Sequence, residues 1–81
     1  MVTAGIDVGS LTGKAVILNE KEIVASKIIR VKKTPVSTAE SVFNAVLSES
    51  DIKREQVNYI VSTGYGRDNI PFTDKSVTEI T

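Results

Sequence analysis

The chain contains no cysteine and no histidine, and these two absences remove several classes of site. Without cysteine it can build neither a disulfide framework nor a cysteine-ligated metal site from its own residues. Without histidine it lacks the commonest general base and a usual zinc ligand. The sequence therefore argues against a disulfide-stabilised fold and against a zinc site of the usual kind.

An excess of either charge is also missing, because 10 basic and 10 acidic residues give a formal net charge of zero. Proteins that bind nucleic acid normally carry a basic excess on one face, so we expect no nucleic-acid partner. A phosphate-bearing ligand is still possible, because a phosphate site depends on local geometry more than on net charge.

Long apolar runs are absent as well. The longest uninterrupted run, from Ala15 to Leu18, is far shorter than the roughly 20 apolar residues that span a bilayer. The first residues lack the basic stretch and long apolar stretch of a signal peptide. We therefore expect a soluble cytoplasmic protein without a membrane segment, and 81 residues leave room for at most one small domain.

What is present predicts several strands and one helix. The alternation of apolar with small or polar residues at the start is typical of a strand with two different faces. The apolar members of this first alternation are Val2, Ala4, Ile6 and Val8. We expect strands at residues 2–8, 14–18, 23–31 and 57–63, with turn residues between the first three and a loop from Gly64 to Asn69.

A helix is expected between the third and fourth strands, after Pro35 and up to about Glu49. Ser37 and Glu40 have the spacing of a capping box, with Ser37 as the N-cap. Apolar residues recur at helical spacing and predict a face that covers the sheet. The residues expected in the core from this face are Phe43, Val46 and Leu47.

This order of elements indicates an α/β fold. A three-stranded antiparallel meander, a crossover helix and a returning fourth strand make up the opening half of a ribonuclease H-like domain, which is the building block of the actin-like ATPase fold. We therefore expect residues 1–81 to be the N-terminal part of such a domain, and the domain to be incomplete.

The segment GIDVGSLTGK (residues 5–14) is the most informative in the chain. It places a carboxylate at the end of a buried strand, then a tight turn of small residues, then a lysine at the start of the next strand. Small residues let the backbone approach a ligand, and their amides can form a concavity for an anion. The lysine supplies a positive charge for a phosphate, and the carboxylate can hold magnesium through its water shell. The candidate ligand-binding residues here are Asp7, Gly9, Ser10, Leu11, Thr12 and Lys14.

The same segment is also compatible with an ordinary hairpin turn, which is common in proteins. Spacing alone leaves the two interpretations about even. Two other features stay open in the same way. The first concerns four residues that follow a strand, where the loop either faces a nucleotide cleft or is simply a glycine-rich turn with an exposed arginine: Thr63, Gly64, Gly66 and Arg67. Arg30, Lys32 and Lys33 are a small basic cluster that we interpret as a solvated strand end, with a binding role as the less favoured alternative.

Four stretches carry a resemblance to a known family. They are the hairpin GIDVGSLTGKAVIL (Gly5 to Leu18), Lys21-Glu22-Ile23-Val24, Thr63-Gly64-Tyr65-Gly66-Arg67 and Thr78-Glu79-Ile80-Thr81. The hairpin resembles the first phosphate-binding hairpin of the superfamily that holds actin, the seventy-kilodalton heat-shock chaperones and the sugar kinases. Over its whole length the chain resembles the ATPase activators of 2-hydroxyacyl-CoA dehydratases and benzoyl-CoA reductases, the BadF/BadG/BcrA/BcrD type. The Thr-Gly-Tyr-Gly-Arg stretch is the more family-specific part.

The resemblance implies specific roles. Asp7 would position Mg²⁺, the backbone of Gly9 and Ser10 with the Ser10 hydroxyl would hold the β- and γ-phosphates of ATP, and Lys14 would neutralise them. It also implies that the complete protein is a homodimer that shares one [4Fe-4S] cluster and delivers an electron to a dehydratase or reductase component. The nucleotide state would drive a conformational change that repositions the cluster.

The chain departs from this family in one respect, since it has no cysteine for the cluster. The second phosphate loop and the adenosine pocket also belong to parts of the family that the chain does not contain. We therefore expect the isolated chain to be a poor ATPase. The alternatives are a sugar or acyl kinase fragment of the same fold, a small non-catalytic interaction domain, and a chain that pairs with itself through open sheet edges.

Overall fold

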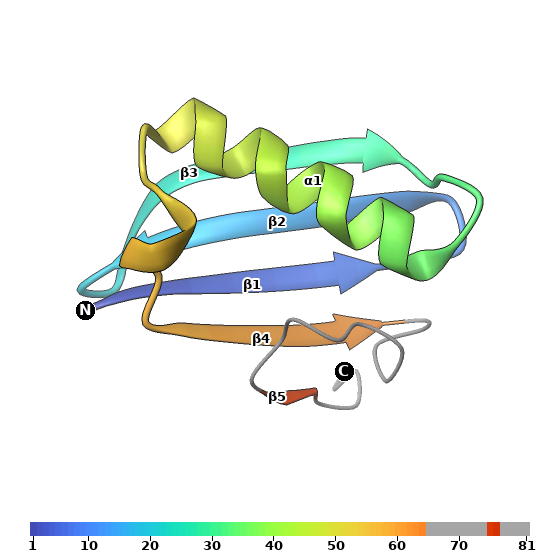
Figure 1. The fold of residues 1–81 in the computed structure, drawn as a ribbon. Helices are drawn as coiled ribbons and strands as arrows, with labels where there is room; N and C mark the ends of the chain where they lie inside the picture. The colour runs from blue at the N-terminus through green and yellow to red at the C-terminus, as the bar shows by residue number, and fades with distance from the viewer. Residues whose placement is uncertain (65–74, 77–81) are drawn as a thin grey trace.

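A computed structural model describes residues 1–64, 75 and 76 of the chain. Its elements, in chain order, are β1 (Val2–Val8), β2 (Thr12–Asn19), β3 (Glu22–Arg30), α1 (Pro35–Ser50), the 3₁₀ turn η1 (Arg54–Gln56), β4 (Tyr59–Gly64) and the short β5 (Lys75–Ser76). The strands form one sheet in the order β3-β2-β1-β4-β5 (Figure 1). The pairs β1–β2 and β2–β3 are antiparallel, and β4 runs parallel to β1. This confirms the predicted meander, crossover helix and returning strand.

The first strand lies in the middle of the sheet and alternates as predicted. Its side chains at Ala4, Ile6 and Val8 are buried, whereas the residues between them are half-buried on the other face. Because successive side chains of a strand point to opposite faces, β1 supplies core residues to one face and polar residues to the other.

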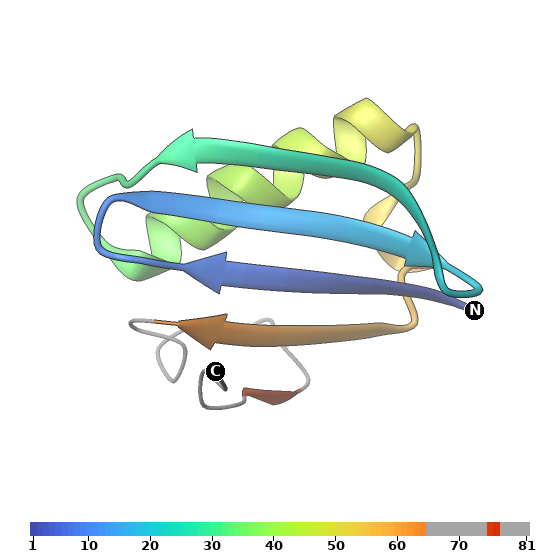
Figure 2. The same cartoon turned by 180° about the vertical axis from the view of Figure 1, so that it is seen from behind.

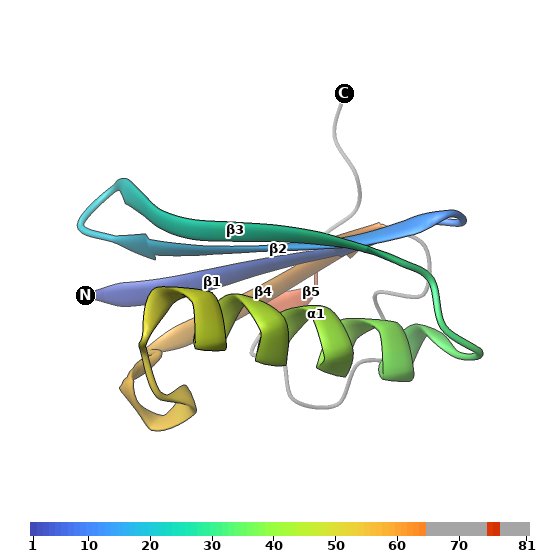
Figure 3. The same ribbon diagram turned by 90° about the horizontal axis from the view of Figure 1, so that it is seen from above.

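The helix α1 covers one face of the sheet, as the view from above shows (Figure 3). Phe43 and Val46 are completely buried and Leu47 is nearly so, as the helical spacing predicts. Together with residues of β1 and β2 they form the hydrophobic core. Seen from behind, the second face of the sheet carries no helix of the described residues (Figure 2).

The start of α1 differs from the prediction. The N-cap is Thr34, with extended backbone angles, and its hydroxyl oxygen accepts a hydrogen bond of 3.0 Å from the Ser37 backbone N–H. Ser37 is therefore inside the first turn and is not the N-cap, so the capping box of Ser37 with Glu40 is wrong. The physical reason is Pro35, which favours an extended residue before it and is suited to the first helical position.

The start and end of β4 also differ slightly from the expected 57–63. Asn58 bonds to Val2 partly through its side chain. Its backbone N–H donates to the Val2 carbonyl at 2.7 Å, and its side-chain oxygen accepts from the Val2 N–H at 2.9 Å. The regular ladder therefore begins at Tyr59. It ends at Gly64, which pairs with Val8 and so belongs to the strand and not to the loop.

Two further contacts hold the helix, one to β3 and one to η1. The Lys27 ammonium of β3 donates to Glu49 of α1 at 2.9 Å, and the Arg54 guanidinium of η1 lies 5.3 Å from the ring centre of Phe43. No helix within the described residues is long and apolar enough to cross a membrane.

Gly13 of β2 lies closely against α1 and leaves no room for a side chain, which leads to a first prediction. A Cβ placed there would lie 2.5 Å from the Thr38 Cγ2 atom, and Thr38 is itself buried and hydrogen-bonded. We expect Gly13→Ala to lower the free energy of unfolding by about 1–3 kcal/mol, the usual cost of overpacking a filled core. Urea unfolding measures this.

Gly5→Ala is the matched control, because a Cβ at Gly5 would meet only the Val16 side chain, at 3.3 Å on the open face. An equal loss of stability in both variants would contradict the contact between β2 and α1.

The ion pair of Lys27 with Glu49 generates a second prediction. The hydrogen bond and the positive charge of Lys27 lower the pKa of Glu49 in the folded protein. A carboxylate with a lowered pKa stabilises the fold above its usual pKa, and this contribution is lost as the pH falls through the lowered value. Glutamine cannot be protonated in this range. We therefore expect the free energy of unfolding to fall less in Glu49→Gln than in the wild type between neutral pH and about pH 3.

Urea midpoints at the two pH values check this prediction. Glu40→Gln is the control, since Glu40 is exposed on the same helix and makes no ion pair with a described residue. The prediction fails if Glu49→Gln and Glu40→Gln show the same pH dependence.

Candidate phosphate-binding site

Two residues of the predicted site, Asp7 and Lys14, lie in one row across the sheet with Thr63. Asp7, near the end of β1, is the register partner of Lys14 on β2 and of Thr63 on β4. All three line the face that α1 leaves open. Asp7 and Thr63 are half-buried and Lys14 is exposed. The fold thus brings a carboxylate, an ammonium and a hydroxyl together from three different strands.

The turn between β1 and β2 lies immediately beside this row. The Gly9 backbone N–H donates to the Thr12 carbonyl at 2.8 Å and closes the hairpin. Ser10 and Leu11 at its tip are exposed, and their backbone N–H groups donate to no other backbone group among the described residues. Such unpaired turn amides are donors that an anion can accept from.

A shallow hollow of about 410 Å³ extends from the polar row over the open face. Apolar side chains line much of it: Val16 and Val61 lie two residues from the polar row along their strands, and Ile28 is the register partner of Lys14. The charged groups gather at the end of the hollow where β1 and β4 finish. Ligands of open α/β sheets bind at this carboxyl edge of the strands, and the polar row lies there.

Several predicted site residues meet at this same edge, and one lies outside the described part. Gly64 ends β4 directly beside Val8, the last residue of β1. Thr12 begins β2 on the other side of the turn. Arg67 and its neighbours Tyr65 and Gly66 lie outside the described residues, so the role predicted for Arg67 stays a prediction.

The residues present fit Mg²⁺ only partly and do not fit an iron–sulfur cluster. Within the described part of the chain no three acidic residues lie together as a metal site would require. Asp7 offers one carboxylate, which suits Mg²⁺ because this ion keeps several waters and takes further oxygens from a bound phosphate. A [4Fe-4S] cluster needs cysteine thiolates, and the sequence has none.

The basic segment that follows β3 lies beside the hairpin turn, a position that sequence spacing did not predict. Lys32 and Lys33 share a second hollow, of about 240 Å³, with Gly9 and Ser10 of the turn. The signal in the sequence was the local charge, since residues 23–39 contain basic residues and no acidic one. Their position beside the turn depends on the antiparallel return of β3 and is not visible in the sequence.

Comparison with known proteins gives the chain its relatives. It is 43% identical over 81 residues to the activator of lactoyl-CoA dehydratase of Anaerotignum propionicum, a match that covers 99% of this chain and 31% of that protein. Its fold superposes with a TM-score of 0.87 and 35% identity on the Clostridium difficile activator of 2-hydroxyisocaproyl-CoA dehydratase with bound ADPNP, over 96% of this chain and 29% of the other. A hexokinase of the ROK type from Thermus thermophilus shares the fold alone, with a TM-score of 0.71 and 12% identity over 98% of this chain and 33% of the hexokinase.

The chain therefore spans about 30% of the length of the curated relatives it matches. The model of the BadF/BadG/BcrA/BcrD ATPase family matches residues 4–81, which is nearly the whole chain. This chain belongs to the BadF/BadG/BcrA/BcrD ATPase family.

Proposed function

We propose that this chain is the phosphate-binding N-terminal part of an ATP-hydrolysing activator that drives electron transfer to a 2-hydroxyacyl-CoA dehydratase. The observation that carries the proposal is the row of Asp7, Lys14 and Thr63 beside a hairpin turn with unpaired amides. Membership of an ATPase family and similarity to an activator that binds ADPNP support it.

Each part of this site has a distinct task in the proposal. The N–H groups of Ser10 and Leu11 in the turn donate hydrogen bonds to the β- and γ-phosphates of ATP, and the Ser10 hydroxyl adds another donor. The Gly9 N–H, predicted as a phosphate donor, instead donates to the Thr12 carbonyl. Lys14 supplies a positive charge from the open face, and its charge-assisted hydrogen bond to phosphate is stronger than a neutral one. Gly64 and Arg67 complete the site from the end of β4. A glycine at position 64 leaves room for the phosphate chain to approach the backbone.

Magnesium would be held at this site by Asp7 through water, and would neutralise charge on the phosphates. No group of this chain can act as a ligand of a [4Fe-4S] cluster, so the proposal routes no step through one. If the complete protein carries such a cluster, its ligands lie in parts that this chain does not contain.

The remaining proposals concern the complete protein. We infer that residues 1–81 form part of a larger actin-like ATPase domain, because the relatives are about three times as long. The complete protein would act as a cytoplasmic homodimer, with the dehydratase as its partner. The isolated chain, without the rest of the nucleotide site, would bind ATP weakly and hydrolyse it slowly.

Lys14 provides the direct test of the phosphate site. We expect Lys14→Gln to weaken the binding of Mg-ADPNP by about ten-fold or more, because a charged hydrogen bond to phosphate contributes roughly 1.5–3 kcal/mol. Titration followed by ¹⁵N NMR measures the affinity, and the amide signals of Ser10 and Leu11 should shift on binding.

Lys21→Gln is the matched control. Lys21 is also exposed, but it lies in the turn between β2 and β3 at the opposite end of the sheet. Equal affinities of Lys14→Gln and the wild type would refute the phosphate site. A wild-type chain that binds no Mg-ADPNP would favour the small non-catalytic interaction domain.

The coding sequence beyond Thr81 tests the proposal for the complete protein. We expect an open frame with a Cys-His-Ala stretch soon after this residue, a second glycine-rich phosphate loop and one further cysteine. A stop codon directly after Thr81 would refute the iron–sulfur activator and leave a binding-only domain as the better account.

A further inference from the structure

Charge is unevenly distributed along this neutral chain. Residues 23–39 contain four basic residues and no acidic one. Lys27 is paired with Glu49, but the other three make no ion pair with any described residue. These three exposed residues, Arg30, Lys32 and Lys33, are called the basic rim below.

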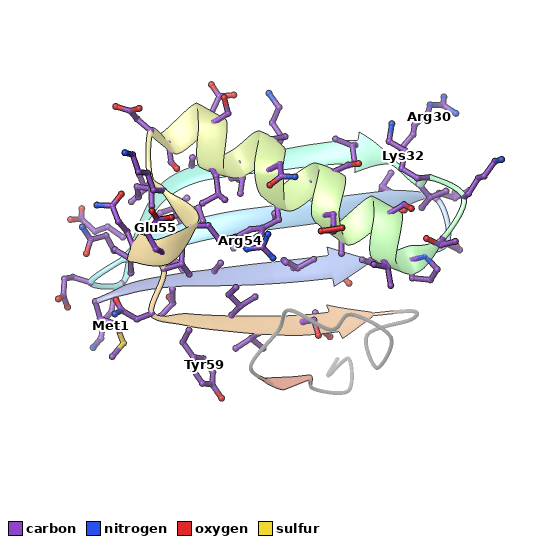
Figure 4. The ribbon with its side chains drawn as sticks, viewed as in Figure 1. Met1, Arg30, Lys32, Arg54, Glu55 and Tyr59 are labelled. Carbon is purple, nitrogen blue, oxygen red and sulfur yellow. The ribbon has the colours of Figure 1, made fainter. Side chains whose placement is uncertain are left out.

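The basic rim is held against the hairpin turn by backbone hydrogen bonds. The Val31 N–H donates to the Leu11 carbonyl at 3.1 Å, which joins the segment after β3 to the tip of the turn. The Lys32 N–H donates to the buried Thr38 hydroxyl at 2.8 Å, which joins it to the first turns of α1. Figure 4 shows Arg30 and Lys32 at this end of the sheet, where β3 finishes and α1 begins. The position of the rim beside the turn is therefore fixed by the fold.

The turn has cations on both faces of the sheet, with Lys14 and Arg30 on the open face and Lys32 and Lys33 on the helix side. Arg30 is the register partner of Thr12 and lies on the open face, diagonally across from Lys14. Diagonal neighbours on adjacent strands are within reach of each other's long side chains. On the helix side, Lys32 and Lys33 line the hollow of about 240 Å³ with Gly9 and Ser10.

Almost no negative charge offsets these four cations locally. Besides the hollow that it shares with the turn, the rim borders another hollow on its helix side, where Lys32 and Lys33 lie beside Ser37. Asp7 is the one acidic residue among the described residues that line the open-face hollow or these two hollows. Cations so close together repel one another, and each alone would bind an anion weakly because water and salt screen it. A ligand with several negative charges can contact them together, which removes the repulsion and adds their attractions.

We propose that the basic rim is a second half of the anion site and binds the phosphate chain of a polyphosphate ligand seated on the hairpin turn. The inference rests on the proposed function, since it takes the nucleotide phosphates as the ligand. It adds Arg30 to the binding residues on the same open face as Lys14, and Lys32 and Lys33 on the helix side of the turn. A nucleoside triphosphate and a free polyphosphate present the same chemistry to the rim.

The test compares two ligands and three variants of the full 81-residue chain. The ligands are Mg-ADPNP and Mg-tripolyphosphate, each titrated at low and at near-physiological ionic strength. The variants are the double substitution Lys32→Gln with Lys33→Gln, the single Arg30→Gln, and Lys14→Gln; Lys21→Gln is the control. Circular dichroism and the thermal midpoint verify that each variant folds, which we expect because all the replaced side chains are exposed.

We expect the double variant to bind both ligands about ten-fold more weakly at low ionic strength, and Arg30→Gln about three-fold more weakly. The salt dependence of binding should become shallower in both, because fewer cations contact the phosphates. Weakening of Mg-ADPNP alone would also support the rim and would assign it to the nucleotide.

Other outcomes separate this inference from the proposed function. If Lys14→Gln weakens binding while the rim variants bind like the wild type, the inference is overturned and the proposed function stands. If only the rim variants weaken tripolyphosphate binding, the rim is an anion site and the nucleotide role of Lys14 fails. A wild-type chain that binds neither ligand overturns both.

Discussion

The pairing of β1 with two neighbours at once is the constraint on which the rest of the structure depends. Its antiparallel ladder with β2 requires the tight turn after Val8, and its parallel ladder with β4 requires a crossover by α1. The same two ladders align Asp7 with Lys14 on one side and Thr63 on the other. A shift of one residue between β1 and β2 would turn the Asp7 carboxylate or the Lys14 ammonium toward the helix and bury its charge. The same shift between β1 and β4 would turn the Thr63 hydroxyl away from Asp7. The core and the site are therefore specified by the same hydrogen bonds.

The two faces of the sheet differ in composition and in what covers them. The face under α1 holds the apolar residues and contributes the hydrophobic stabilisation, and its fit is tight where Gly13 meets Thr38. The other face carries the polar row and an apolar hollow. The groups proposed to bind phosphate thus lie at the carboxyl edge, where the hairpin turn and the basic rim meet.

Comparison of the sequence-based predictions with the structure shows where local rules suffice. The alternation in β1 and the apolar stripe of α1 predicted the buried residues correctly, because a residue that faces the core must be apolar and therefore sets the pattern. The N-cap was assigned to Ser37 because Ser37 and Glu40 have capping-box spacing. The actual cap depends on Pro35 and on which hydroxyl meets a free N–H, and this is Thr34. The start of β4 was displaced because Asn58 bonds Val2 partly through its side chain, which no pattern of hydropathy contains.

The sequence by itself determined the order of elements, the buried faces and the hairpin with its carboxylate and lysine, because these follow from periodicity and from residue types in one short segment. Its resemblance to a family also determined which relatives to expect, and membership of that family is confirmed. Only the tertiary structure decided that Thr63 lies beside Asp7 and that Lys32 and Lys33 lie beside Gly9. Those contacts join residues far apart in the chain, and they depend on strand register and on the path of the crossover, which sequence spacing does not encode.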